Sequence, residues 1–219
     1  MKIYLIPGLG YDHRIFEGLP LADYEVECLN WLEPRKHEVI SDYSLRLFDG
    51  VPADEDIVLI GHSIGGVIAQ EIAAKRKIRK VILISSVQSR GEIPGSFRLV
   101  KPLGLYRLMT KELTIKTVKY WGGSNGLVSD ADKDLFKSMI SGYSNSYLQW
   151  ALKELSGWQS AGGPSITSIF RIHGTEDKTF PIIGLIAPPD VVIEGGSHFM
   201  VHAEAEQVGK AVIEALRVD

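Results

Sequence analysis

The chain has 219 residues, 45% of them hydrophobic and 23% charged, which suits one globular domain that needs no disulfide or metal to complete its core. The net charge of -3 and the pI of about 6.1 give no electrostatic argument for binding nucleic acid or an anionic membrane. Cys28 is the only cysteine, so an intramolecular disulfide is excluded and we expect a small core residue there.

The amino-terminal apolar run Lys2–Ile6 is too short for the hydrophobic region of a signal peptide, and Pro7 ends it. No stretch of the sequence approaches the roughly 18 apolar residues of a membrane span. We therefore expect a cytoplasmic protein.

Short apolar runs rich in β-branched residues recur along the chain and predict strands. They are Lys2–Ile6, Glu25–Leu29, Ile57–Ile60, Lys80–Ile84, Ser168–Ile172 and Val191–Ile193. Runs that are apolar on both faces are typical of parallel strands buried between helices. Helical patterns separate them, such as the stripe of Ile64, Val67, Ile68 and Ile72. The alternation predicts an α/β fold with a mostly parallel sheet of about six strands.

The first strand leads into Gly8-Leu-Gly10, and this turn raises a dinucleotide-binding alternative. The match is weak, because His13 occupies the third glycine position and the second strand ends near the neutral Asn30. We therefore predict no nucleotide cofactor.

Residues 61–66 read Gly-His-Ser-Ile-Gly-Gly, between a predicted strand and a predicted helix. This is a G-x-S-x-G nucleophile elbow in the setting that it requires. A sharp turn would expose the Ser63 hydroxyl at the amino end of the helix, where the N–H groups favour developing negative charge. Gly61 and Gly65 would let strand and helix approach closely, and the Ile64 amide is a natural oxyanion donor.

Between Val87 and Ser165 the strand signal gives way to helix signals. Ser129–Asp132 resembles a capping box, and Leu148, Ala151 and Leu155 form a helical stripe. About 75 residues exceed what one crossover helix needs. We predict a helical cap over residues 91–164, left through Gly162-Gly-Pro164, and a core over residues 1–90 and 165–219. The alternative is that these are ordinary packing helices.

The elbow and its setting resemble the α/β-hydrolase superfamily, over about residues 1–90 and 165–219. In that superfamily the order along the chain is nucleophile, acid, histidine. Residues 173–181 resemble its H-G-x-x-D-x-x-x-P acid loop, and residues 195–198 resemble its G-G-x-H loop. The resemblance implies Asp177 as the acid and His198 as the base.

Neighbouring residues leave alternatives for both roles. Glu176 is the rival acid, His202 is the rival base, and we expect His173 to brace the acid loop. In the superfamily the loop after the first strand commonly reads H-G, and the residue after the glycine supplies the second oxyanion donor. The match implies the Leu9 amide, but Pro7 replaces the usual histidine, which leaves Gly10 as an alternative.

Six histidines invite a metal site, with His198 and His202 at i, i+4 spacing and Glu194 and Glu204 nearby. The approach to His198 through Gly-Gly-Ser is not helical, and the H-E-x-x-H pattern is absent from the sequence. We therefore predict no catalytic metal.

The residues and the resemblance together predict a serine hydrolase that cleaves a small carboxylic ester, or a related thioester or lactone, through Ser63, His198 and Asp177. The alternatives are a ligand receptor on the same scaffold, a carbon–carbon hydrolase or a lyase. Cap aromatic residues favour a substrate with an apolar group. The residues that we expect to bind it are Tyr11, Trp121, Tyr147 and Trp150.

Overall fold

Six strands form one sheet in the computed structural model, which describes residues 1–52, 56–161 and 167–217. All neighbouring strands are parallel, in the order β2-β1-β3-β4-β5-β6. The strands are β1 (Lys2–Ile6), β2 (Glu25–Cys28), β3 (Ile57–His62), β4 (Lys80–Ile84), β5 (Ser168–Gly174) and β6 (Val191–Ile193). The predicted fold class is confirmed, and every predicted strand is present.

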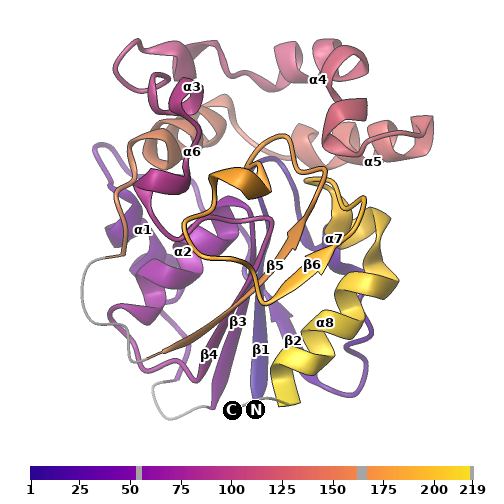
Figure 1. Ribbon diagram of the computed structural model, residues 1–219. Helices are drawn as coiled ribbons and strands as arrows, with labels where there is room; N and C mark the ends of the chain where they lie inside the picture. The colour runs from indigo at the N-terminus through magenta and orange to yellow at the C-terminus, as the bar shows by residue number, and fades with distance from the viewer. Residues whose placement is uncertain (53–55, 162–166, 218–219) are drawn as a thin grey trace.

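Eight α-helices lie in the described part of the chain. They are α1 (Ile40–Leu47), α2 (Ile64–Ala73), α3 (Gly95–Arg98), α4 (Lys111–Trp121), α5 (Asp130–Ser141), α6 (Asn145–Gly157), α7 (Met200–Ala203) and α8 (Ala205–Arg217). Helices α1 and α2 cover one face of the sheet and α8 covers the other, while α3 to α6 lie above its upper edge (Figure 1). None of these helices is long and apolar enough to cross a membrane.

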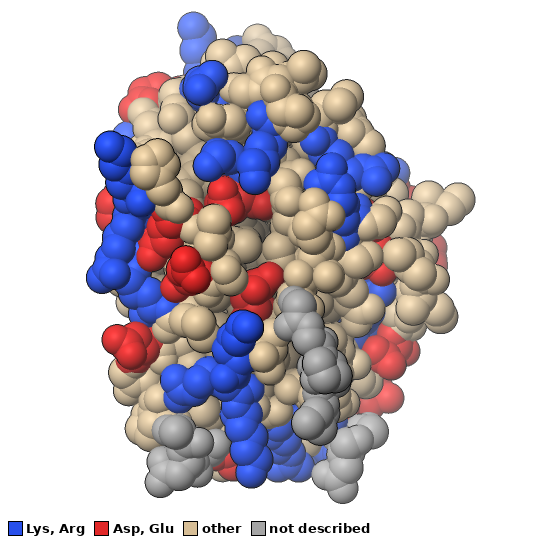
Figure 2. All heavy atoms as spheres, turned by 90° about the vertical axis from the view of Figure 1, so that its left-hand side faces the viewer, with Lys and Arg blue, Asp and Glu red and all other residues tan. Residues whose placement is uncertain are grey.

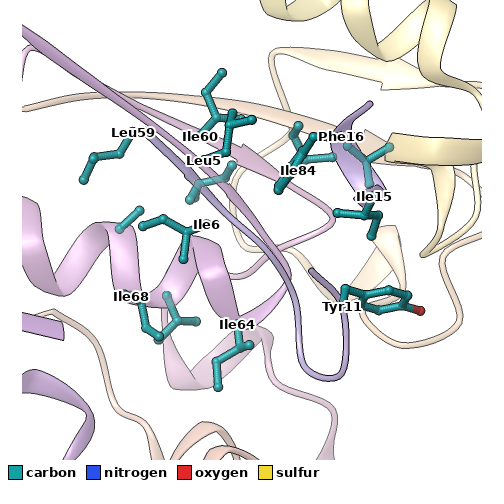
Figure 3. Packing of buried hydrophobic residues seen from close by; sticks show 14 of the residues in the cluster. Leu5, Ile6, Tyr11, Ile15, Phe16, Leu59, Ile60, Ile64, Ile68 and Ile84 are labelled. Carbon is teal, nitrogen blue, oxygen red and sulfur yellow. The ribbon is translucent and has the colours of Figure 1, made fainter. Parts of the chain in front are cut away.

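The core lies where α2 packs against the central strands. Every residue from Ile64 to Ile72 is buried, because α2 contacts β1, β3 and β4 as well as α1. Figure 3 shows part of this cluster, with Leu5 and Ile6 of β1, Leu59 and Ile60 of β3, and Ile64 and Ile68 of α2. The elbow therefore lies at the start of a helix that is buried against the centre of the sheet.

The edge strand β2 departs from the expectation that the strands are apolar on both faces. Glu25, Val26 and Glu27 are exposed, and both glutamates pair with Lys2 on β1. Charges on an edge strand discourage pairing with a second chain. Cys28 at its end is only partly buried, and burial raises the pKa of its thiol to about 12, so it is not a reactive thiolate.

The segment between β4 and β5 contains helices α3 to α6. The predicted capping box starts α5, since the Asp132 amide donates to Ser129 Oγ at 3.0 Å and the Ser129 amide donates back to Asp132 Oδ2 at 2.9 Å. Helix α6 contacts both α1 and α2, so this end of the segment is continuous with the core. The predicted linker Gly162–Pro164 lies outside the described residues.

The strand order reverses between β1 and β3, because the chain leaves β1 toward β2 and later adds β4, β5 and β6 on the other side. Ligands of open α/β sheets bind beyond the carboxyl ends of the strands at such a reversal. The loop after β1 and the turn after β3, which hold Leu9 and Ser63, meet at this point.

Candidate active site

Ser63 lies in a tight turn between β3 and α2, with φ 54° and ψ -122°. A positive φ is uncommon for a residue with a side chain, and such strained conformations concentrate at functional sites. The neighbouring glycines make the turn possible. A Cβ on Gly65 would collide with the carbonyl oxygen of Ile6, and one on Gly61 would collide with the backbone of Gly65.

The ring of His198 lies between Ser63 and Asp177. His198 Nε2 is 3.0 Å from Ser63 Oγ, and His198 Nδ1 is 2.9 Å from Asp177 Oδ2 and 3.0 Å from Asp177 Oδ1. All three side chains are buried. An ionised carboxylate only accepts hydrogen bonds, so Nδ1–H donates to Asp177 and the lone pair of Nε2 faces the Ser63 hydroxyl. In this tautomer His198 can accept the Ser63 proton.

The Asp177 carboxylate is held from several sides. The amides of Thr179 and Phe180 both donate to Oδ1 at 2.9 Å. Burial by itself would raise the pKa of Asp177, but the charge and hydrogen bond of His198 and the Phe180 amide outweigh it, so the pKa lies below its usual value. His173 braces the same loop, because its Nε2–H donates to the Phe180 carbonyl oxygen at 2.7 Å.

Glu176 and His202, the alternative candidates for the acid and the base, lie apart from the contacts of Ser63, His198 and Asp177. Glu176 is exposed and pairs with Lys178 at 2.7 Å, so its carboxylate points to solvent. The ring of His202 packs against Phe199 at 4.9 Å between centroids, and its buried Nδ1 has no hydrogen-bond partner among the described residues. Neither side chain takes part in the Ser63–His198–Asp177 contacts.

His62 is a part of the site that the sequence did not reveal, since it occupies the variable position of the elbow. Its ring is fully buried, and its Nε2–H donates to the carbonyl oxygen of His198 at 2.9 Å. A Cβ on Gly8 would approach His62 Nδ1 to 2.6 Å, so the imidazole also lies directly against the loop after β1. Burial, reinforced by the nearby His198, lowers the pKa of His62 to about 3 and keeps its ring neutral.

The loop after β1 is fixed as a turn. The Tyr11 amide donates to the Gly8 carbonyl oxygen at 3.1 Å, and Gly10 has a φ of 80° that favours glycine. The amides of Leu9 and Ile64 donate to no acceptor in the part of the chain that the structure describes. Leu9 also lines the same cavity as Ser63. Both amides are therefore available to a ligand at the turn.

A cavity of about 390 Å³ opens above Ser63 and His198. Its lining is mostly apolar and comes from the loop after β1, the segment between β4 and β5, and the acid loop. The lining residues are Leu9, Tyr11, Ser63, Phe97, Leu108, Met109, Leu113, Thr114, Thr117, Trp121, Asn125, Phe136, Leu152, Leu155, Thr179 and His198. The volume falls within the usual range for small-molecule sites.

Of the four aromatic residues expected to bind substrate, Tyr11 and Trp121 line this cavity. Tyr147 and Trp150 do not, and here the sequence expectation was wrong. Both are on the face of α6 that packs toward the core. Tyr147 is buried beside Trp31, with ring centroids 5.2 Å apart, and Trp150 donates from Nε1 to the Glu38 carbonyl oxygen at 2.7 Å.

Asn125 was also not anticipated, although it joins three parts of the site. It lines the cavity, and its Oδ1 accepts a hydrogen bond from Thr179 Oγ1 of the acid loop at 2.7 Å. Its carbonyl oxygen accepts from the Phe199 amide, next to His198, at 3.1 Å. The segment above the sheet is therefore bonded directly to the loops that carry Asp177 and His198.

The described lining contains no Lys, Arg, Asp or Glu side chain. An apolar wall of this kind suits an uncharged ligand, because a buried ionised group without a partner carries a large desolvation cost. Within the described ranges, no three His, Cys, Asp or Glu side chains gather where they could hold a metal ion. Gly8–Gly10 leads into a short 3₁₀ helix, His13–Phe16, in place of the α-helix that a dinucleotide turn requires.

The parallel sheet, the strained serine turn after a central strand, and the acid and histidine on later loops define the architecture of an α/β hydrolase. The profile of the alpha/beta hydrolase family matches residues 3–211, and the chain belongs to this family.

Solved structures share the fold over nearly the whole chain. An esterase from Exiguobacterium antarcticum is 15% identical with a TM-score of 0.77, and the match covers 100% of this chain and 92% of the esterase. MenH from S. aureus is 16% identical with a TM-score of 0.75, over 99% and 93% of the two chains. A bromoperoxidase from Bacillus anthracis is 16% identical with a TM-score of 0.73, over 99% and 92%. At these identities the similarity shows the fold alone. No curated protein matches the chain by sequence.

Proposed function

We propose that this chain hydrolyses carboxylic esters of uncharged, apolar acyl groups through an acyl-enzyme on Ser63. The observation that carries the proposal is the unbroken set of contacts from Asp177 through His198 to Ser63 Oγ, at the base of an apolar cavity. A nucleophile, a base and an orienting carboxylate in this arrangement activate a serine hydroxyl.

In the proposed reaction, His198 Nε2 takes the Ser63 proton while Oγ attacks the carbonyl carbon of the ester. The ionised Asp177 stabilises the imidazolium that forms and keeps its orientation. The free amides of Ile64 and Leu9 donate to the oxyanion of the tetrahedral intermediate. His198 then protonates the departing alcohol, and water releases the acid from Ser63 with His198 again acting as the base.

We propose further that helices α3 to α6 form the cap of residues 91–164 and govern the choice of substrate. Support comes from the lining, in which Phe97, Leu108, Trp121 and Phe136 all come from this segment. The catalytic groups, by contrast, all come from the loops of the sheet. Thioesters and lactones fit the same machinery, so the test must compare these bond types directly.

The test is turnover of p-nitrophenyl esters of increasing chain length, alongside a thioester and a lactone with matched acyl groups. We expect an initial burst from the acyl-enzyme, labelling of Ser63 by a fluorophosphonate, and repeated turnover. In the folded Ser63→Ala variant, activity should fall by roughly 10⁴–10⁶-fold. Labelling without turnover would indicate a receptor, and retention of more than a tenth of the activity would exclude Ser63 as the nucleophile.

A further inference from the structure

Charge is unevenly distributed along the chain, although its total is only -3. The stretch from residue 96 to residue 121, which spans most of α3 and all of α4, has six basic residues and a single acidic one. The basic residues are Arg98, Lys101, Arg107, Lys111, Lys116 and Lys119. The low net charge of the whole chain therefore conceals a strongly cationic segment.

The same stretch exposes large apolar side chains. They are between 44% and 78% exposed, and they are Leu99, Leu103, Leu105, Leu108, Leu113 and Tyr120. A single exposed leucine needs no explanation, but six large apolar side chains within 22 residues indicate a surface that meets something other than water. We call these residues, together with the six basic residues, the cap surface.

Helix α4 shows how the two kinds of side chain are combined. At 100° per residue, its exposed side chains project within about a third of the helix circumference. They are Glu112, Leu113, Lys116, Lys119 and Tyr120. Thr114 and Val118 on the opposite side are buried. Apolar and cationic groups therefore share the outer face, where a helix in contact only with water would carry polar residues.

The cations of the cap surface have no acidic partner in the part of the chain that the structure describes. Among the described residues, none of the six lies within ion-pair distance of a carboxylate. Glu112, the one acidic residue of the stretch, accepts a hydrogen bond from Asn145 at 3.0 Å. In Figure 2, blue side chains interleave with tan ones over the top of the face shown, where few red ones lie. The surface is thus complementary to an anionic partner.

The cap surface also borders the cavity above Ser63. Leu108 and Leu113 are exposed to solvent and at the same time line that cavity. A molecule that leaves an apolar phase at this surface would therefore reach the cavity without crossing water.

We propose that the cap surface docks onto an anionic lipid interface. Leucines would enter the boundary between headgroups and acyl chains, while Lys and Arg extend their charged ends to the lipid phosphates. A nucleic acid would use the cations but leave the leucines in water, so it fits the surface less well. The proposal concerns binding and is independent of the ester hydrolysis proposed for Ser63.

The test is co-sedimentation of the full chain, carrying Ser63→Ala, with phosphatidylcholine vesicles that contain or lack phosphatidylglycerol. We expect binding that depends on phosphatidylglycerol and weakens with added salt. The pair Lys116→Glu/Lys119→Glu should lower the partition coefficient by about 30-fold or more, given that each cation near an anionic surface contributes about fivefold. Leu103→Ser should lower it as well.

The matched control is Lys75→Glu/Lys77→Glu, which makes the same change in net charge on exposed residues at the opposite edge of the sheet. It should bind vesicles like the parent. With Ser63 restored, Lys116→Glu/Lys119→Glu should hydrolyse a soluble acetate ester at the parent rate, which separates docking from catalysis. Absence of sedimentation, equal sedimentation with both vesicle types, or an equal loss in the control pair would each overturn the proposal.

Discussion

At the scale of single residues, the buried imidazole of His62 connects parts of the site that lie far apart in the sequence. It comes from the elbow, donates to the main chain of His198, and lies against the loop that presents Leu9. The elbow and His198 are therefore linked by a second hydrogen bond besides the one between the side chains of Ser63 and His198. We infer that His62 is a positioning residue and does not itself exchange protons with substrate.

Replacing His62 by leucine should lower kcat for a small ester by about 10- to 100-fold, because a buried carbonyl oxygen next to the base loses its donor. KM should change little, since His62 does not line the cavity. His62→Gln keeps an N–H donor and should recover most of the rate. Steady-state kinetics with a circular dichroism check on folding measures this, and a His62→Leu enzyme with wild-type kcat would refute the role.

At the scale of elements, α4 presents different residues to the cavity and to solvent. Trp121 faces the cavity, where its Nε1–H donates to Thr117 Oγ1 at 3.2 Å and its ring meets Phe136 edge-on at 5.4 Å. Tyr120, its neighbour, is exposed. The pair provides a mutation and a matched control on one turn of one helix.

Trp121→Ala should reorder a series of soluble p-nitrophenyl esters, because one aromatic contact in an apolar pocket changes discrimination by roughly 10–200-fold. The acetate is too small to need contact with Trp121, so it should react almost as before. Tyr120→Ala should keep the wild-type order. The measurement is kcat/KM across the series. An unchanged order in Trp121→Ala would mean that this part of the cavity lining does not select the acyl chain.

A buried ion pair connects the sheet to the start of the segment between β4 and β5. Glu92, which follows β4, accepts from Arg171 of β5 at 2.8 and 3.1 Å and from the Ile186 amide at 3.0 Å. Glu92→Ala should lower the free energy of unfolding by about 3–5 kcal/mol, because Arg171 is left buried without its counter-charge. Urea unfolding measures this loss.

The double variant Glu92→Met/Arg171→Met tests the reason for that loss. It removes both charges and should be more stable than Glu92→Ala. If it were less stable, the loss would come from missing contacts and not from an unpaired charge.

Most strands were predictable because they are short apolar runs, as in Lys2–Ile6 before Pro7 and Ile57–Ile60 before Gly61. The cavity lining was predictable only in part, since Tyr11 and Trp121 line it but Tyr147 and Trp150 do not. Periodicity marks the apolar face of a helix, but it does not say whether that face meets the core or a cavity. Trp121 and Trp150 have similar sequence signals, yet one lines the cavity while the other packs over Glu38. His62 was missed for a similar reason, since a buried partner distant in sequence gives the residue its role.

At the scale of the whole molecule, buried neutral histidines link stability to pH. The pKa of His62 is about 3 in the folded chain against an ordinary 6.5, and burial also lowers the pKa of His173. Below about pH 6.5 the unfolded chain binds protons that the folded chain does not. The free energy of unfolding should therefore fall on acidification, by up to about 1.4 kcal/mol per pH unit for each histidine.

Urea unfolding at pH values between neutrality and about 5 should show this decline, and His62→Gln should show a shallower one. Burial raises the pKa of Glu71 and Glu204, which acts in the opposite direction, but equally in both proteins. The difference between the two slopes therefore isolates His62. Parallel slopes would mean that His62 binds protons equally in the folded and the unfolded chain.

The hydrogen bonds of Asn125 to the acid loop and to the histidine loop limit how this segment can be exchanged between homologous enzymes. A chimera that replaces residues 95–121 and keeps the native 3₁₀ helix Gly123–Asn125 retains the acceptors for Thr179 and Phe199. A chimera whose junction lies beyond that helix replaces these acceptors with those of the other protein. The loops that carry Asp177 and His198 would then need compensating substitutions. Recombination upstream of Gly123 can therefore vary the part of the cavity lining that comes from residues 95–121, while the loops that carry Asp177 and His198 keep their hydrogen bonds to Asn125.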